Sequence, residues 1–142
     1  MTKKCRVLEG GLCEITQKYK KGKHDGIDLV GKNHTLAWEV AHSDGEVVGL
    51  KKNFKGFKEG SYGNYVKLKH ADGYYTLYAH GKYNTAKVKV GDKVKRGDKL
   101  QYMGNTGYPS YLLPPSVNEL QKNSQYYPYI EVYRHALLYR LL

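Results

Sequence analysis

The feature that most constrains the fold is a pair of alternating segments joined by an Asp-Gly turn. Residues 62–70 alternate between polar or aromatic side chains and aliphatic ones, and residues 74–80 follow directly after a turn at residues 71–73. An alternation with a period of two is typical of a β-strand and not of a helix. Asp-Gly between two such runs is the strongest short-range signal for a β-hairpin. The chain is therefore expected to build its core on antiparallel strands.

Composition extends this expectation to the whole chain. Tyrosine occurs 15 times against two phenylalanines and one tryptophan, and glycine occurs 16 times against four prolines. Tyr- and Val-rich segments cut by glycines favour short strands and tight turns over a helical bundle. Further strands are expected at residues 24–31, 36–41, 45–50 and 127–133, with Gly-Asp turns at residues 91–92 and 97–98 and one short helix at residues 116–122. Because 142 residues support one core, we predict a single all-β domain over residues 1–142.

Charge and hydropathy narrow the range of partners. The formal net charge is +11. A basic surface favours polyanions such as nucleic acid, anionic lipid or cell-wall polymers, although evenly spread lysines are equally consistent with a solvated surface. No apolar run approaches the roughly 18–20 residues that a membrane-spanning helix needs, and no apolar segment follows the basic N-terminus as in a secretory signal peptide. Cys5 and Cys13 are expected to be free thiols unless an oxidising compartment lets them pair.

Histidines provide the first candidates for chemistry. His24 and Asp28 are four residues apart, so on a strand their side chains share one face, and imidazole and carboxylate are both good zinc ligands. The alternative is a surface histidine and an unrelated aspartate. His80 ends the second hairpin strand beside a loop, a position suited to proton transfer. His70 is expected to be structural because it adjoins the Asp-Gly turn, and His42 is expected to be exposed.

Six short motifs follow one another along the chain. They are His24-x-Gly-x-Asp28-Leu, Asp44-Gly-x-Val47, Tyr62-Gly-Asn-Tyr-Val, His70-x-Asp-Gly-Tyr-x-Thr-Leu-Tyr-Ala-His80, Val90-Gly-Asp-x-Val-x-x-Gly-Asp and Gly104-Asn-Thr-Gly107. This order closely resembles the lysostaphin/LytM-type zinc endopeptidases, the family that cleaves peptide cross-links of bacterial peptidoglycan. The resemblance covers roughly residues 14–133. It implies an all-β groove built on an antiparallel sheet, of the barrel-sandwich hybrid type.

The resemblance also implies roles for individual residues. In the family, the histidine and aspartate of H-x-x-x-D bind zinc, and these positions match His24 and Asp28. The histidine that ends Tyr-Ala-His is catalytic, and His80 matches it. A later H-x-H motif supplies a second catalytic histidine and then the third zinc ligand. The chain departs from the pattern here, because tyrosine stands at both matching positions, Tyr127 and Tyr129.

These tyrosines weaken the implied chemistry. A catalytic zinc site normally has three protein ligands and one open position. Tyr129 would serve as a ligand only as phenolate, and the reference pKa of a tyrosine is about 10. Tyr127 would donate a hydrogen bond to an oxyanion but would not act as a general base while protonated. The substrate groove is expected to be lined by Tyr62, Asn64 and Tyr108, the last at the start of a longer, proline-containing stretch than the family has there.

Two hypotheses for function follow from the resemblance. The favoured one is a catalytically degenerate domain whose groove binds peptidoglycan, another anionic wall polymer or a protein partner without cleaving it. The alternative is an active zinc endopeptidase with an altered metal site. In either case the family implies a location outside the cell, at the cell wall or on a phage virion. Residues 88–100 also resemble the half-barrel of biotinyl and lipoyl carrier domains, but the carrier's Met-Lys-Met hairpin is absent, and no specific nucleic-acid-binding motif is present.

Overall fold

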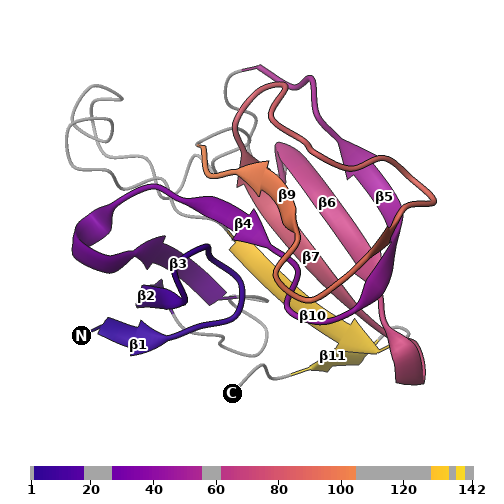
Figure 1. Ribbon diagram of the computed structural model, residues 1–142, viewed down its shortest axis with the longest axis horizontal. Helices are drawn as coiled ribbons and strands as arrows, with labels where there is room; N and C mark the ends of the chain where they lie inside the picture. The colour runs from indigo at the N-terminus through magenta and orange to yellow at the C-terminus, as the bar shows by residue number, and fades with distance from the viewer. Residues whose placement is uncertain (1, 18–26, 56–61, 105–128, 135–136, 140–142) are drawn as a thin grey trace.

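The hairpin predicted at residues 62–80 forms the centre of the main sheet (Figure 1). Strand β6 (Asn64–Lys69) pairs antiparallel with β7 (Tyr74–Gly81), and a 3₁₀ turn, η2 (Ala71–Gly73), connects them. Gly73 has a φ of +74°, a left-handed conformation that glycine adopts without steric cost. The computed structural model describes residues 2–17, 27–55, 62–104, 129–134 and 137–139.

The other strands are mostly short. They are β1 (Thr2–Lys4), β2 (Leu12–Gln17), β3 (Ile27–Gly31), β4 (Trp38–Val40), β5 (Gly45–Lys51), β8 (Lys93–Val94), β9 (Lys99–Tyr102), β10 (Tyr129–Arg134) and β11 (Leu137–Tyr139). A second 3₁₀ turn, η1 (Lys32–His34), follows β3. The helix predicted at residues 116–122 lies outside the described residues. In the part of the chain that the structure describes, no helix is long and apolar enough to cross a membrane.

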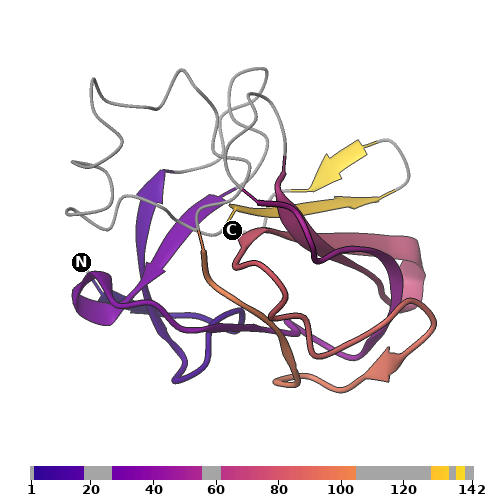
Figure 2. The same ribbon diagram turned by 90° about the horizontal axis from the view of Figure 1, so that it is seen from above.

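The strands form two antiparallel sheets. The larger has the order β1-β2-β3-β10-β7-β6-β5-β8, with β11 paired to β10, and the smaller consists of β4 and β9. Figure 1 shows β9 in front of β6 and β7. In Figure 2 the segment that contains β8 and β9 lies on the side of the molecule opposite to β10 and β11. The predicted all-β class is confirmed.

The core is made by alternate residues of the central strands together with residues of β9 and its neighbours. In β6, Val66 and Leu68 are fully buried, whereas Tyr65 and Lys67 between them are half-buried, as the period of two predicts. The largest fully buried apolar side chains are Tyr78, Leu8, Leu68, Leu100 and Met103. Each such side chain contributes roughly 1.5–3 kcal/mol through burial, so this core holds the two sheets together.

Two predicted strands that are neighbours in the sequence pair with different partners. β4 pairs with β9, whereas β5 pairs with β6 and β8. Ala41 fixes this crossing, because its N–H donates to the carbonyl of Asp98 (2.9 Å) and its carbonyl accepts from Gly97 N–H (2.9 Å). The connection therefore carries the chain from one sheet to the other. Cys5 and Cys13 are free thiols, as predicted.

Candidate functional site

His80, the penultimate residue of β7, has a backbone conformation that is rare for a residue other than glycine. Its φ of +59° lies in the left-handed region. The His80 N–H donates to the carbonyl of Tyr62 (2.9 Å), and the His80 carbonyl accepts from Gly104 N–H (2.9 Å), so neighbouring segments hold this backbone from both sides. A left-handed conformation costs a non-glycine residue roughly 1–2 kcal/mol. Strain of this kind concentrates at functional sites, which marks His80 as a functional candidate.

The same conformation changes how the histidine relates to the core. In a regular strand, His80 would share a face with Tyr78, two residues earlier, which is fully buried. The left-handed φ interrupts that alternation. His80 is nevertheless buried, with 6% of its surface exposed.

Asp28 and Tyr129 occupy directly opposite positions on neighbouring strands. Strand β10 lies between β3 and β7, and its residue Ile130 is level with Tyr78 of β7. One residue earlier on β10, Tyr129 pairs with Asp28 of β3. Directly opposed residues in antiparallel strands have Cβ atoms about 4.5–5.5 Å apart. Since His80 lies two residues beyond Tyr78, the backbones of three predicted site positions lie at similar levels on three neighbouring strands.

The described residues do not make up a catalytic zinc site. Such a site takes three ligands from His, Cys, Asp and Glu, and within the described ranges no three of these side chains gather closely enough to hold a metal ion. Asp28 is half-buried, and the position opposite it is a tyrosine, which is not among the usual zinc ligands. The predicted site residues His24, Tyr108 and Tyr127 lie outside the described residues, and only the backbone of Tyr129 is described.

Tyr62 and Asn64, two of the predicted groove residues, occupy different environments. Tyr62 is 40% exposed, and its ring lies edge-on to that of Tyr65 with 6.4 Å between centroids. Asn64 is fully buried. Its side-chain oxygen accepts from Phe54 N–H (2.7 Å), and its amide donates to the carbonyls of Phe54 (3.0 Å) and Gly81 (3.1 Å). The Asn64 side chain thus links the backbone of Phe54 to the backbone of Gly81, next to His80. Of the two predicted groove residues Tyr62 and Asn64, only Tyr62 faces solvent.

Aromatic rings and lysines surround this end of β7. Lys51 Nζ lies 5.0 Å from the centre of the Phe54 ring, and Lys55 Nζ lies 4.6 Å from that of Tyr83. Tyr83 is 43% exposed. We refer to Phe54, Tyr62 and Tyr83 as the aromatic rim. Exposed rings beside cations offer flat, amphipathic contact area, which suits the binding of an extended polymer or peptide.

A buried carboxyl group next to the site was not anticipated from the sequence. Glu39 on β4 and Gln101 on β9 are register partners, and the Gln101 amide donates to Glu39 Oε1 (3.1 Å) and to the carbonyl of Tyr78 (3.0 Å). Glu39 Oε2 has no hydrogen-bond partner among the described residues. Burial raises the pKa of the Glu39 carboxyl well above its ordinary value. The available signal was a single charged residue within the apolar run at 36–41.

His70 is structural, as predicted. Its Nε2 lies 2.6 Å from Thr76 Oγ1, its Nδ1 lies 2.8 Å from the carbonyl of Asp44, and its ring stacks on Tyr74 with 4.6 Å between centroids. The expectation that His42 is exposed was wrong. Its ring is half-buried 6.3 Å from that of His70, because the crossing between the sheets carries it inward, and its buried Nδ1 has no partner within the described part of the chain. Burial lowers the pKa of both imidazoles.

The sequence of this chain is similar to those of known peptidase-family proteins. Residues 22–126 match the model of peptidase family M23. The murein hydrolase activator NlpD of Salmonella dublin is 37% identical over 90 residues, which are 63% of this chain and 22% of that protein. The chain thus spans about a fifth of the length of the curated relatives it matches.

Two solved structures share the fold. A chain of the SpoIIQ–SpoIIIAH pore-forming complex superposes with a TM-score of 0.70 at 19% identity, covering 97% of this chain and 87% of that one. A zinc-containing peptidase from Vibrio cholerae superposes with a TM-score of 0.62 at 21% identity, covering 97% of this chain and 37% of that one. At these identities the likeness establishes the fold alone.

Proposed function

Because this chain belongs to peptidase family M23, we propose that it is a catalytically degenerate member that binds the bacterial cell wall or a protein partner in its groove. M23 is a family of zinc-dependent peptidases. The observation that carries the proposal is the register of β3 and β10, which puts Tyr129 directly opposite Asp28. The family resemblance assigns the third zinc ligand to that position, and a tyrosine occupies it.

The chemistry of the substituted positions supports a loss of catalysis. A neutral phenol is not among the usual zinc ligands, so the metal would be held by two ligands where three are normal. Replacement of the second catalytic histidine by Tyr127 removes a general base, and general acid–base catalysis typically contributes about 10² to 10⁴ in rate. An exposed aromatic surface is available for binding, since Tyr62 and Tyr83 are exposed and the Tyr62 carbonyl accepts from His80 N–H.

The relatives support a binding role without requiring hydrolysis. NlpD is named as an activator of murein hydrolases, and the SpoIIQ–SpoIIIAH structure is a protein–protein assembly. We therefore expect the occupant of the groove to be a peptidoglycan peptide or a segment of a protein. Such a role places the domain outside the cytoplasm, at the wall or on a virion.

An active zinc endopeptidase is the competing function. It is favoured by the retention of Asp28 and His80 on the two strands that flank β10. Under this alternative, His24, Asp28 and Tyr129 would hold the zinc, which would supply an activated water for hydrolysis of peptidoglycan cross-links.

Zinc content separates the two functions. We expect protein purified without chelators to contain no stoichiometric zinc by elemental analysis, whereas the double variant Tyr127→His/Tyr129→His should gain about one zinc per chain because it restores the usual ligand type. The opposite result is one zinc per wild-type chain and release of peptides from cell walls by the wild-type protein, with both lost in His24→Ala. That result would establish the active enzyme and end the proposal.

Binding is tested by sedimentation with purified peptidoglycan. Tyr62→Ala should lower the bound fraction, because Tyr62 is exposed at the rim, whereas Leu36→Ala, at a similarly exposed position (46% against 40%), should leave it unchanged. Wild-type protein that stays wholly in the supernatant would exclude the wall-binding form and leave a protein as the partner.

A further inference from the structure

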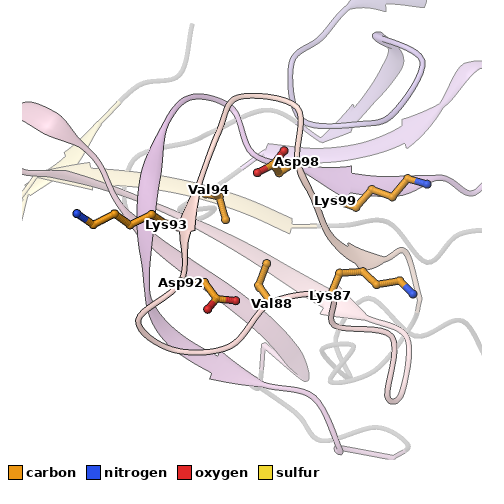
Figure 3. A pocket seen from close by; sticks show the side chains of 7 residues that line it. All are labelled: Lys87, Val88, Asp92, Lys93, Val94, Asp98 and Lys99. Atoms are coloured by element: carbon orange, nitrogen blue, oxygen red, sulfur yellow. The ribbon is translucent and has the colours of Figure 1, made fainter.

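A hollow lies where the two Gly-Asp turns face each other (Figure 3). It has a volume of about 510 Å³, within the roughly 300–1,000 Å³ typical of ligand sites. Val88 and Val94 point towards each other across its centre. Lys87 and Lys99 extend together to one side, and Lys93 extends to the other. The hollow therefore has an apolar middle and positively charged ends.

One aromatic ring holds two of these lysines in place. The Nζ atoms of Lys87 and Lys99 each lie 5.3 Å from the centre of the Trp38 ring, an arrangement worth about 0.5–1 kcal/mol per cation at an exposed site. Trp38 packs edge-on against Tyr102 with 5.3 Å between ring centroids. Glu9 Oε2 lies 3.4 Å from Lys99 Nζ and partly neutralises this end.

Two aspartates provide hydrogen-bond acceptors inside the hollow. One carboxylate oxygen of Asp92 accepts from Lys89 N–H (3.0 Å), and one of Asp98 accepts from Lys95 N–H (2.9 Å). These bonds close the two turns and fix both carboxylates. Each carboxylate has a second oxygen that is able to accept from a hydroxyl group.

We propose that this hollow binds a polyol phosphate chain, a polymer in which phosphodiester groups alternate with short hydroxyl-bearing carbon units. Ammonium groups at the two ends match phosphates that are separated by a spacer. The aspartates match the hydroxyls of that spacer, and the valines match its carbon atoms. The backbone of DNA, by contrast, has no free hydroxyl from which Asp92 and Asp98 could accept a hydrogen bond.

This site is separate from the one at His80. It is lined by residues 87–99, and β8 is separated from β7 by β5 and β6 in the sheet order. The inference rests on the proposed function only in placing the domain where it meets such polymers. A hollow for the phosphate polymer and a groove for the peptide would let one domain contact two components of a wall.

The test uses the full chain and poly(glycerol phosphate) free of peptidoglycan, with affinities measured by isothermal titration calorimetry at 50 and 200 mM NaCl. The pair Lys87→Gln/Lys99→Gln should bind about fivefold to tenfold more weakly, as expected for two lost charge contacts. The matched pair Lys4→Gln/Lys32→Gln removes the same charge from exposed positions on β1 and η1 and should change affinity less than about twofold. Glu9→Gln should bind more tightly, because it removes the counter-charge from Lys99.

Several outcomes would overturn the site. Equal weakening by both lysine pairs would mean that only general positive charge is involved. Double-stranded DNA bound as tightly, with the same dependence on Lys87 and Lys99, would exclude selectivity for a polyol spacer. The two proposals fail separately: the Lys87→Gln/Lys99→Gln pair should still sediment with peptidoglycan stripped of phosphate polymers, and Tyr62→Ala should still bind poly(glycerol phosphate).

Discussion

Replacement of Glu39 by glutamine should make the protein's stability less dependent on pH. The Glu39 side chain is completely buried, one of its oxygens accepts from the Gln101 amide, and the other has no partner in the described ranges. Burial raises the pKa of this carboxyl, so the folded protein keeps it protonated where the unfolded chain ionises it. Glutamine has nearly the same shape and does not titrate.

The size of the effect follows from linkage. Below pH 4.5, the ordinary value for this group, both states hold the proton and Glu39 imposes no pH-dependent cost. Above that pH the unfolded chain releases the proton while the folded protein retains it, so the free energy of unfolding falls by about 1.4 kcal/mol per pH unit until the folded pKa is reached. The difference between Glu39→Gln and wild type should therefore grow with pH at that slope.

Urea denaturation at pH values from 4 to 8, followed by the fluorescence of the single tryptophan, measures this difference. Other titrating groups are common to both proteins and cancel in the comparison. A constant difference in unfolding free energy between Glu39→Gln and wild type does not bear on the test. The glutamine N–H groups need hydrogen-bond partners of their own at every pH and so shift the whole curve equally. Free-energy curves that run parallel across this range would refute the reasoning, since they would mean that Glu39 ionises alike in the folded and unfolded states.

Three further perturbations test the packing around the site. Gly81→Ala should destabilise the fold by about 1–3 kcal/mol in urea denaturation, because the added methyl would overlap the Gln101 side-chain amide; an unchanged midpoint would contradict this contact. Tyr78→Phe should cost about 1–3 kcal/mol, because the Tyr78 hydroxyl accepts from His42 N–H (2.9 Å), and a loss within experimental error would count against it. Because burial holds the pKa of His42 and His70 below 6.5, the unfolded chain takes up protons first, so these two histidines lower the stability of the fold between pH 7.5 and 5.5, opposite in sign to the contribution of Glu39. His42→Gln should lose less stability than wild type in thermal melts at these two pH values, and equal losses would argue against its burial.

The elements that the sequence predicts well are those specified by neighbouring residues. The hairpin at 62–80 follows from a period of two and an Asp-Gly turn, and both are local properties. The Gly-Asp turns are likewise local: Gly91 and Gly97 have φ values of +96° and +90°, and the aspartate after each accepts a nearby N–H. The motif order was sufficient to identify the family, which the match over residues 22–126 bears out.

Environment was less predictable than secondary structure. His42 was expected to be exposed because no partner adjoins it in the sequence, yet the crossing between the sheets places it beside His70. Glu39 lies in β4, and its register partner Gln101 lies in β9, which is far away along the chain. Burial depends on which strands pack together, and a window of neighbouring residues does not contain that information.

The candidate site shows the same division. The sequence alone determined which chemical groups are available: an aspartate at 28, a histidine at 80, and tyrosines where the family resemblance implies histidines. The tertiary structure decided where these positions stand, since only the insertion of β10 between β3 and β7 sets Tyr129 opposite Asp28 on one side and places β7, which carries His80, on the other. The physical reason is that side-chain identity and backbone period are encoded locally, whereas cross-strand register is decided by the burial of one face of a sheet built from distant segments.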